Sequence, residues 1–184
     1  APISFGIGQL APAVAAFLCD YPEVDIAMVL EDRFVELVAE GYDAAIRIGT
    51  LADSSLVARK IAETRSVMVA APAYVAASGM PLTIDDLGEH QLLQCSILST
   101  GNFWRLRGPS GEERQVRVGG RLTINNGEAL MRAAEAGIGI AQVPSFMCAG
   151  ALAAGRLVEV LADRPADILG VQVVYPPGRY PQPK

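Results

Sequence analysis

The chain has 184 residues, of which 51% are hydrophobic and 19% charged, and its formal net charge is -5. This length fits one large domain or two small lobes, and the composition excludes a disordered tail. A surface that attracts the DNA backbone needs a clustered excess of Lys and Arg. The acidic balance therefore predicts that this segment binds DNA poorly by itself.

Hydrophobic spacing in the first fifty residues predicts an alternation of helix and strand. The expected elements are a helix at 10–18 that stops at Pro22, a strand at 24–30, a helix from Asp32 to Gly41 and a strand at 44–48. Such alternation is typical of a parallel sheet with right-handed crossovers.

The rest of the chain continues with strands, short helices and a hairpin or loop around Trp104. Local signals predict strands at 56–62, 66–71, 92–96, 138–143, 157–161 and 170–175. They predict helices from Pro72 to Gly79, at 83–86, from an Asn125 and Glu128 capping pair to Gly137, and at 144–154.

This order predicts an α/β fold of two lobes. Lobe I is expected to comprise 1–70 plus 170–184, and lobe II 71–169, because the last strand returns after the second block of elements. In open α/β sheets, ligands bind at the carboxyl ends of strands, beside helix N-termini. A cleft between two such lobes would suit a small anion.

The number of cysteines and the length of the apolar segments indicate the cellular compartment of the protein. The three cysteines, Cys19, Cys95 and Cys148, are odd in number and widely spaced, which argues against a disulfide framework or a CxxC metal site. A reducing cytosol is the simplest location. The long alanine-rich stretches are interrupted, for example at Gly137 and Pro144, so no membrane-spanning helix is expected.

A catalytic centre has little support in the sequence. The one histidine, His90, precedes Cys95 by five residues, but a role in capping or bonding the turn at 85–93 is favoured over nucleophilic catalysis. Gly6 and Gly8 lack the third glycine of a dinucleotide fingerprint. We therefore expect no cofactor, no metal and no enzymatic activity.

Polar residues at predicted strand ends and helix starts are the remaining candidates for a site. Most have an ordinary explanation as caps or loop residues. Arg47 differs because it lies between Ile46 and Ile48, where an unpaired charge is costly to bury. We expect it to meet an acidic neighbour, Asp43 or Glu31, or to face a ligand.

An ordered set of short motifs runs along nearly the whole chain. It consists of Ala1–Gly6, 10–12, 17–18, Tyr21-Pro22, 32–49, 53–59, 71–74, Asp86-Leu87 with His90, Trp104, and 135–141 with Pro144. No single piece is diagnostic, but in this order the set resembles the effector-binding domain of LysR-type transcriptional regulators.

The resemblance implies two Rossmann-like lobes, similar to type II periplasmic binding proteins, with a small effector in the interlobe cleft. It implies a cytoplasmic homodimer or tetramer that needs no cofactor and no membrane. Promoter DNA would be bound by an N-terminal winged helix-turn-helix and linker helix, which these 184 residues do not contain.

The resemblance also implies which residues contact the effector. They are Ser4, Phe5, Glu31, Asp32, Arg47, Ser96, Ser99, Thr100, Gly101, Asn102, Asn125 and Asn126. The effector class stays open among anionic, aromatic and cationic molecules. Two alternatives also stay open. One is an extracytoplasmic solute-binding protein of similar fold, although three unpaired cysteines are unusual in an oxidising compartment. The other is a small enzyme using His90 and Cys95.

Overall fold

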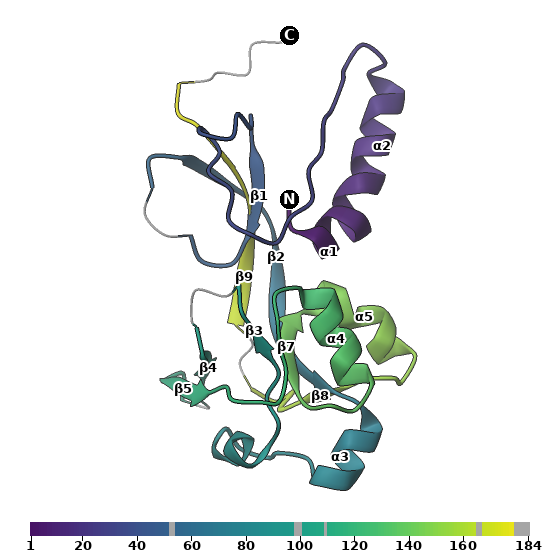
Figure 1. Ribbon diagram of the computed structural model, residues 1–184, viewed down its shortest axis with the longest axis vertical. Helices are drawn as coiled ribbons and strands as arrows, with labels where there is room; N and C mark the ends of the chain where they lie inside the picture. Colours follow the sequence, from purple (N-terminus) through teal and green to yellow (C-terminus); the bar gives the residue numbers. More distant parts are fainter. Residues whose placement is uncertain (52–53, 98–100, 109, 165–166, 179–184) are drawn as a thin grey trace. The chain divides into compact units, whose positions relative to one another are not determined.

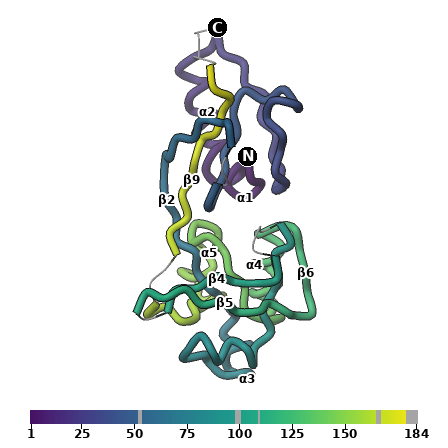
Figure 2. The backbone as a smooth tube through the Cα atoms, turned by 90° about the vertical axis from the view of Figure 1, so that its left-hand side faces the viewer, coloured from purple at the N-terminus to yellow at the C-terminus, as the bar shows by residue number. Residues whose placement is uncertain are grey.

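The computed structural model describes residues 1–51, 54–97, 101–108, 110–164 and 167–178, in two compact units (Figure 1). Unit 1 comprises Ala1–Glu63 and Leu169–Lys184, and unit 2 comprises Thr64–Ile168. Two strands, β2 (Val57–Ala70) and β9 (Asp167–Tyr175), contain the points at which the chain passes from one unit to the other. They are neighbours in the main sheet (Figure 2).

Unit 1 begins with a helical run made of α1 (Ile3–Phe5), a π-helical segment (Gly6–Leu10) and α2 (Ala11–Asp20). The predicted helix at 10–18 is confirmed, and it begins earlier than expected. A Cβ on Gly6 would lie 2.2 Å from the Leu30 side chain, so a larger residue there would force Leu30 to move.

This run is also unusually apolar for an uncovered helix. Ile3–Asp20 spans 18 residues with a mean hydropathy of 1.4, and 6% of the window is buried. By length and composition alone, it is the one helix among the described residues that could cross a membrane. A single such helix near the N-terminus is weak evidence for a membrane span, since signal sequences and helices of soluble proteins meet the same test.

Two predicted elements of unit 1 do not form. Residues 24–30 are not assigned to a strand, because their alternation has no ladder partner beyond the bonds that Ala1 makes with Val29 and Glu31. The segment from Asp32 to Gly41 holds turns instead of a helix. Asp32 Oδ1 accepts from Ile3 N at 2.9 Å and so contacts α1, rather than capping a helix of its own.

The strand predicted at 44–48 is confirmed as β1 (Ala45–Ile48). It pairs antiparallel with β9, Ala45 opposite Val174 and Ile48 opposite Val171. The sheet order is β1-β9-β2-β7, with β8 (Val158–Val160) also on β2, and β2 pairs antiparallel with both β7 (Ala141–Pro144) and β8. The predicted parallel sheet in the first fifty residues is wrong, because the neighbour of β1 comes from the far end of the chain.

Unit 2 contains the other elements. The two strands predicted at 56–62 and 66–71 form the single strand β2, while the helix from Pro72 to Gly79 is confirmed as α3 (Pro72–Ser78). The others are a 3₁₀ helix (Asp85–Glu89), β3 (Gln94–Cys95), β4 (Phe103–Arg107), β5 (Glu113–Arg117), β6 (Thr123–Ile124), α4 (Gly127–Glu135) and α5 (Ser145–Ala153). The hairpin expected around Trp104 is β4 paired with β5.

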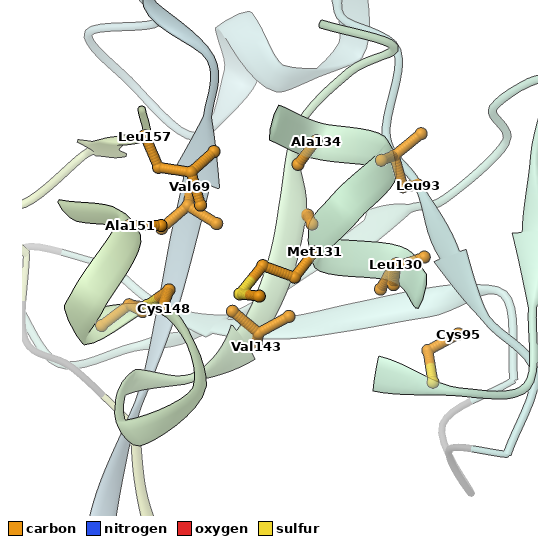
Figure 3. Close-up of a cluster of buried hydrophobic side chains, with 12 residues drawn as sticks. Val69, Leu93, Cys95, Leu130, Met131, Ala134, Val143, Cys148, Ala151 and Leu157 are labelled. Atoms are coloured by element: carbon orange, nitrogen blue, oxygen red, sulfur yellow. The ribbon is translucent and has the colours of Figure 1, made fainter. Parts of the chain in front are cut away.

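The core of unit 2 lies on both faces of β2. Successive strand residues point to opposite faces, so Val67 and Val69 join one buried cluster while Met68 and Ala70 join another. Figure 3 shows the first cluster, which α4 and α5 supply with Leu130, Met131, Ala134, Cys148 and Ala151. Burial on both faces explains the uninterrupted apolar run at the end of β2.

Candidate functional site

The predicted site residues at the start of unit 1 are tied together by backbone contacts. Ser4 and Phe5 lie in α1, and the first N–H of that helix, from Ile3, donates to Asp32 Oδ1 at 2.9 Å. Glu31 N donates to the Ala1 carbonyl, also at 2.9 Å. Glu31 and Asp32 therefore lie beside the start of α1, although they are far from it in sequence.

Arg33 offsets part of the negative charge in this region. Its Nε lies 2.6 Å from Glu31 Oε2, and its two terminal nitrogens contact both carboxylate oxygens of Glu40, at 2.9 and 2.6 Å. The hydrogen bond from Arg33 lowers the pKa of Glu40 to about 2. The carboxylate of Glu31 is therefore ion-paired. Arg33, which forms this pair, was not predicted as a residue of the candidate site.

Arg47 lies half-buried in β1. One of its terminal nitrogens donates to the Val35 carbonyl at 3.1 Å, and its guanidinium carbon lies 5.2 Å from the centroid of the Phe34 ring. A cation over an aromatic face is stabilised by the ring quadrupole. Phe34 was expected inside a helix, and no local pattern indicates a contact between residues thirteen positions apart.

The unit 2 candidates gather at the ends of two parallel strands. β3 and β6 pair with Gln94 opposite Thr123 and Cys95 opposite Ile124, so Ser96 and Asn125 each directly follow a strand at the same edge. Ser96 N donates to the Ile124 carbonyl at 2.9 Å. This is the edge at which ligands bind in open α/β sheets.

Asn126 caps α4 at this edge. Its Oδ1 accepts from Ala129 N at 2.9 Å, and the predicted capping pair of Asn125 with Glu128 is wrong. Glu128 instead pairs with Arg132 at 3.1 Å, one turn along the helix. The cap lies one residue later than predicted, at Asn126, which has the extended backbone of an N-cap.

Two of the remaining unit 2 candidates, Gly101 and Asn102, lie between β3 and β4. Asn102 Oδ1 accepts from Gln94 Nε2 at 2.5 Å, and its carbonyl accepts from Val118 N at 2.7 Å. Gly101 has a φ of 62°, a backbone conformation that favours glycine. Ser99 and Thr100 lie outside the described residues.

His90 makes a structural contact. Its Nδ1 lies 3.1 Å from the Tyr74 hydroxyl, which also accepts from Gln91 N at 2.9 Å. Cys95 packs in the hydrophobic cluster under α4. The structure thus places His90 with Tyr74 and supports the role in the turn that was favoured over catalysis.

Comparisons with known proteins identify the family to which the chain belongs. The LysR substrate binding domain model matches residues 1–184. An uncharacterized HTH-type transcriptional regulator of Haemophilus influenzae is 36% identical over 180 residues, which are 97% of this chain and 62% of that protein. The solved regulatory domain of AphB from Vibrio vulnificus has a TM-score of 0.80 at 31% identity, covering 95% of this chain and 87% of that one. The regulatory domain of CrgA from Neisseria meningitidis has a TM-score of 0.81 at 28% identity, covering 96% and 86%.

These matches confirm the predicted fold class, an α/β fold of two lobes like that of type II periplasmic binding proteins. The chain spans 62% and 57% of the length of two curated relatives that it matches. The family match, in contrast, extends over the whole chain. The chain belongs to the family of LysR substrate-binding domains, the regulatory domains of LysR-type transcriptional regulators.

Proposed function

We propose that this chain senses a small-molecule effector within a cytoplasmic LysR-type transcriptional regulator and catalyses no reaction. The observation that carries the proposal is the polar edge of unit 2, where the parallel strands β3 and β6 end beside the capped N-terminus of α4. Curated relatives named as HTH-type transcriptional regulators support the regulatory role over an extracytoplasmic solute-binding protein. Promoter DNA would be contacted by a winged helix-turn-helix and linker helix outside these residues.

The charges favour an effector that carries an anionic group. In unit 1, Arg47 supplies guanidinium N–H groups. In unit 2, taken by itself, the N-terminus of α4 carries the positive end of a helix dipole. Glu31 does not oppose this choice, because Arg33 pairs with its carboxylate. We propose the twelve residues inferred from the family resemblance as the effector contacts, with Arg47 as the principal cation.

A thermal-shift screen tests the sensing function. The purified chain is heated with aliphatic acids, aromatic acids, amino acids and amines, each compared with buffer alone. A ligand present at about a hundred times its dissociation constant should add about 2.7 kcal/mol of apparent stability. Arg47→Ala should remove the shift produced by an anionic effector, and Asn125→Ala should weaken it without disturbing the cap of α4.

Arg59→Ala is the matched control, because Arg59 is an exposed arginine of the same unit, on β2. It should leave the ligand-induced shift unchanged. A shift that Arg47→Ala and Asn125→Ala both retain would contradict the proposed contacts. A screen in which none of the four classes raises the midpoint would count against the sensing function.

We also propose that a second copy of the chain covers α2. The helical run exposes Ile7, Phe17 and Tyr21 to 64%, 41% and 48%, and the rings of Phe17 and Tyr21 stack with centroids 4.5 Å apart. By contrast, α4 buries Leu130, Met131 and Ala134 in its own unit. We therefore assign the interface of a homodimer or tetramer to the exposed apolar face of α2.

Sedimentation velocity tests the self-association. The chain should sediment as a dimer or larger species that dissociates on dilution, and Phe17→Glu should shift it to monomer. Phe103→Glu is the matched control, because Phe103 lies in β4 with a similar exposed fraction of 42%. A chain that is monomeric at every concentration, or equal dissociation by both variants, would contradict this assignment.

A further inference from the structure

Unit 2 contains a pocket that none of the predicted effector residues lines. Five strands contribute to its walls, through Ser66 and Met68 of β2, Leu106 of β4, Gln142 of β7, Glu159 of β8 and Asp167 of β9. Its enclosed volume is about 30 Å³, and the figure rises to about 350 Å³ when space open to solvent is included. The enclosed part can hold a group about as small as a carboxylate, with the rest of the molecule outside.

Arg164 lines this pocket and lies at the end of an unusual turn. After β8, Leu161 has a φ of 54°, a left-handed conformation that no other non-glycine among the described residues adopts. The turn closes with Arg164 N donating to the Leu161 carbonyl at 3.3 Å, and both residues line the pocket. Strained backbone of this kind clusters at ligand sites. The turn therefore supports a ligand site separately from the charge of Arg164.

The guanidinium of Arg164 is incompletely satisfied. One terminal nitrogen, Nη2, donates to the Arg107 carbonyl, while Nε and Nη1 are buried without a hydrogen-bond partner in the part of the chain that the structure describes. Burial lowers the pKa of Arg164, and the charges of Asp167 and Glu112 oppose this effect. An arginine nevertheless stays protonated in proteins, so the pocket holds a cation with unused donors.

The two acidic residues of the pocket already contact other arginines. Asp167 Oδ1 lies 3.3 Å from Arg107 Nε, and Glu159 Oε2 lies 3.6 Å from a terminal nitrogen of Arg65. Their presence disfavours a ligand with two negative charges. Of the two arginines that line the pocket, Arg107 pairs with Asp167, and Arg164 has no hydrogen-bonded carboxylate among the described residues. A ligand with one negative charge therefore matches Arg164.

We propose that this pocket is a second ligand site, which binds the carboxylate of a small monocarboxylic acid through Nε and Nη1 of Arg164. Ser66 and Gln142 also line the pocket, and their hydroxyl and amide groups can act as further donors. Charge-assisted hydrogen bonds to a carboxylate are stronger than neutral ones and suit a partly buried guanidinium. The site lies within unit 2 and does not depend on the proposed effector contacts.

Nitrogen-15 NMR of the arginine Nε–H signals tests the proposal with acetate and benzoate as probes. Sodium chloride at equal ionic strength is the reference. The signal of Arg164, assigned as the one lost in Arg164→Lys, should shift saturably with acetate or benzoate and stay unchanged with chloride. Inorganic phosphate at pH 8, largely doubly charged, should bind more weakly than acetate.

Variants separate this site from other binding. Arg164→Gln should weaken acetate binding by about tenfold or more, measured by calorimetry. Arg105→Gln, at an exposed arginine of β4 that does not line the pocket, should change acetate binding by less than about twofold. Arg47→Ala should leave the response of the Arg164 signal intact. An Arg164 signal that neither acid moves, or binding that Arg164→Gln retains, would overturn the proposal, as would phosphate binding tighter than acetate.

Discussion

Asn126 is expected to have two separable roles, which makes its substitution informative. Its Oδ1 accepts from Ala129 N at 2.9 Å and caps α4, the helix that carries Leu130 and Met131 into the core of unit 2. Loss of an asparagine N-cap costs about 1 kcal/mol, within a range of about 0.5–2. Asn126→Ala should therefore lower the free energy of unfolding by about 1 kcal/mol, or the thermal midpoint by about 2–4 °C for a chain of this size.

Trp104 provides the readout for unit 2. It is the one tryptophan of the chain and is 3% exposed in the second buried cluster. Its fluorescence during urea unfolding should report the loss of packing in the unit that α4 belongs to. Asn126→Ser should restore most of the stability, because a serine hydroxyl also caps helices, while removing the amide proposed to contact the effector.

Asn125→Ala is the matched control for this prediction. Asn125 is exposed and precedes the cap, so the variant should unfold within about 0.5 kcal/mol of the parent. Equal destabilisation by Asn125→Ala and Asn126→Ala would refute the assignment of the cap, and so would full stability in Asn126→Ala.

Two further predictions concern titratable groups. Arg33→Gln should raise the pKa of Glu40 from about 2 toward its ordinary value of about 4.3, as followed by NMR titration of the carboxyl carbon. Because the folded-state pKa is the lower one, this ion pair contributes stability above the unfolded pKa and loses it as pH falls toward 2; an unchanged pKa would contradict the bidentate contact. A thiol reagent at mildly alkaline pH should label exposed Cys19 rapidly, and Cys95 and Cys148 only on unfolding, since both are buried and burial raises the pKa of Cys148. Rapid labelling that persists in Cys19→Ser would contradict this order.

Elements with local start and stop signals could be predicted from the sequence. Pro72 at the first helical position and Gly79 with a φ of 86° bound α3, and both act through their own backbone geometry. Gly137, with a φ of 78°, likewise follows the end of α4. Such signals need no knowledge of the rest of the fold, which explains why these boundaries were predicted correctly.

Elements that depend on distant partners could not be predicted in this way. Residues 24–30 alternate as a strand would, but a strand also requires a neighbour, and none pairs with them in a ladder. The same limit applies to the site. The position of Arg47 between Ile46 and Ile48 marked it as a candidate. Its contacts with Phe34 and the Val35 carbonyl, however, follow from the turns at 32–41, which the sequence predicted as a helix.

Arg47 and Arg164 are both partly buried cations on a small acidic chain, and they differ in how well their guanidinium groups are compensated. Arg47 has an aromatic face and a carbonyl, but Arg164 has a carbonyl and two buried nitrogens without hydrogen bonds. Each unsatisfied buried group costs about 1–3 kcal/mol, and a hydrogen bond returns about 1. Without ligand, Arg164 should therefore destabilise unit 2.

Arg164→Met should accordingly raise the urea midpoint reported by Trp104, by on the order of 1 kcal/mol, in a buffer free of carboxylates. Arg107→Met should instead lower it, because Asp167 would lose the guanidinium 3.3 Å away. In saturating acetate the stabilising effect of Arg164→Met should shrink or reverse, because only the parent gains binding energy. Destabilisation by Arg164→Met without ligand would show that the arginine serves the fold, and the argument for a second carboxylate site would then lose its energetic basis.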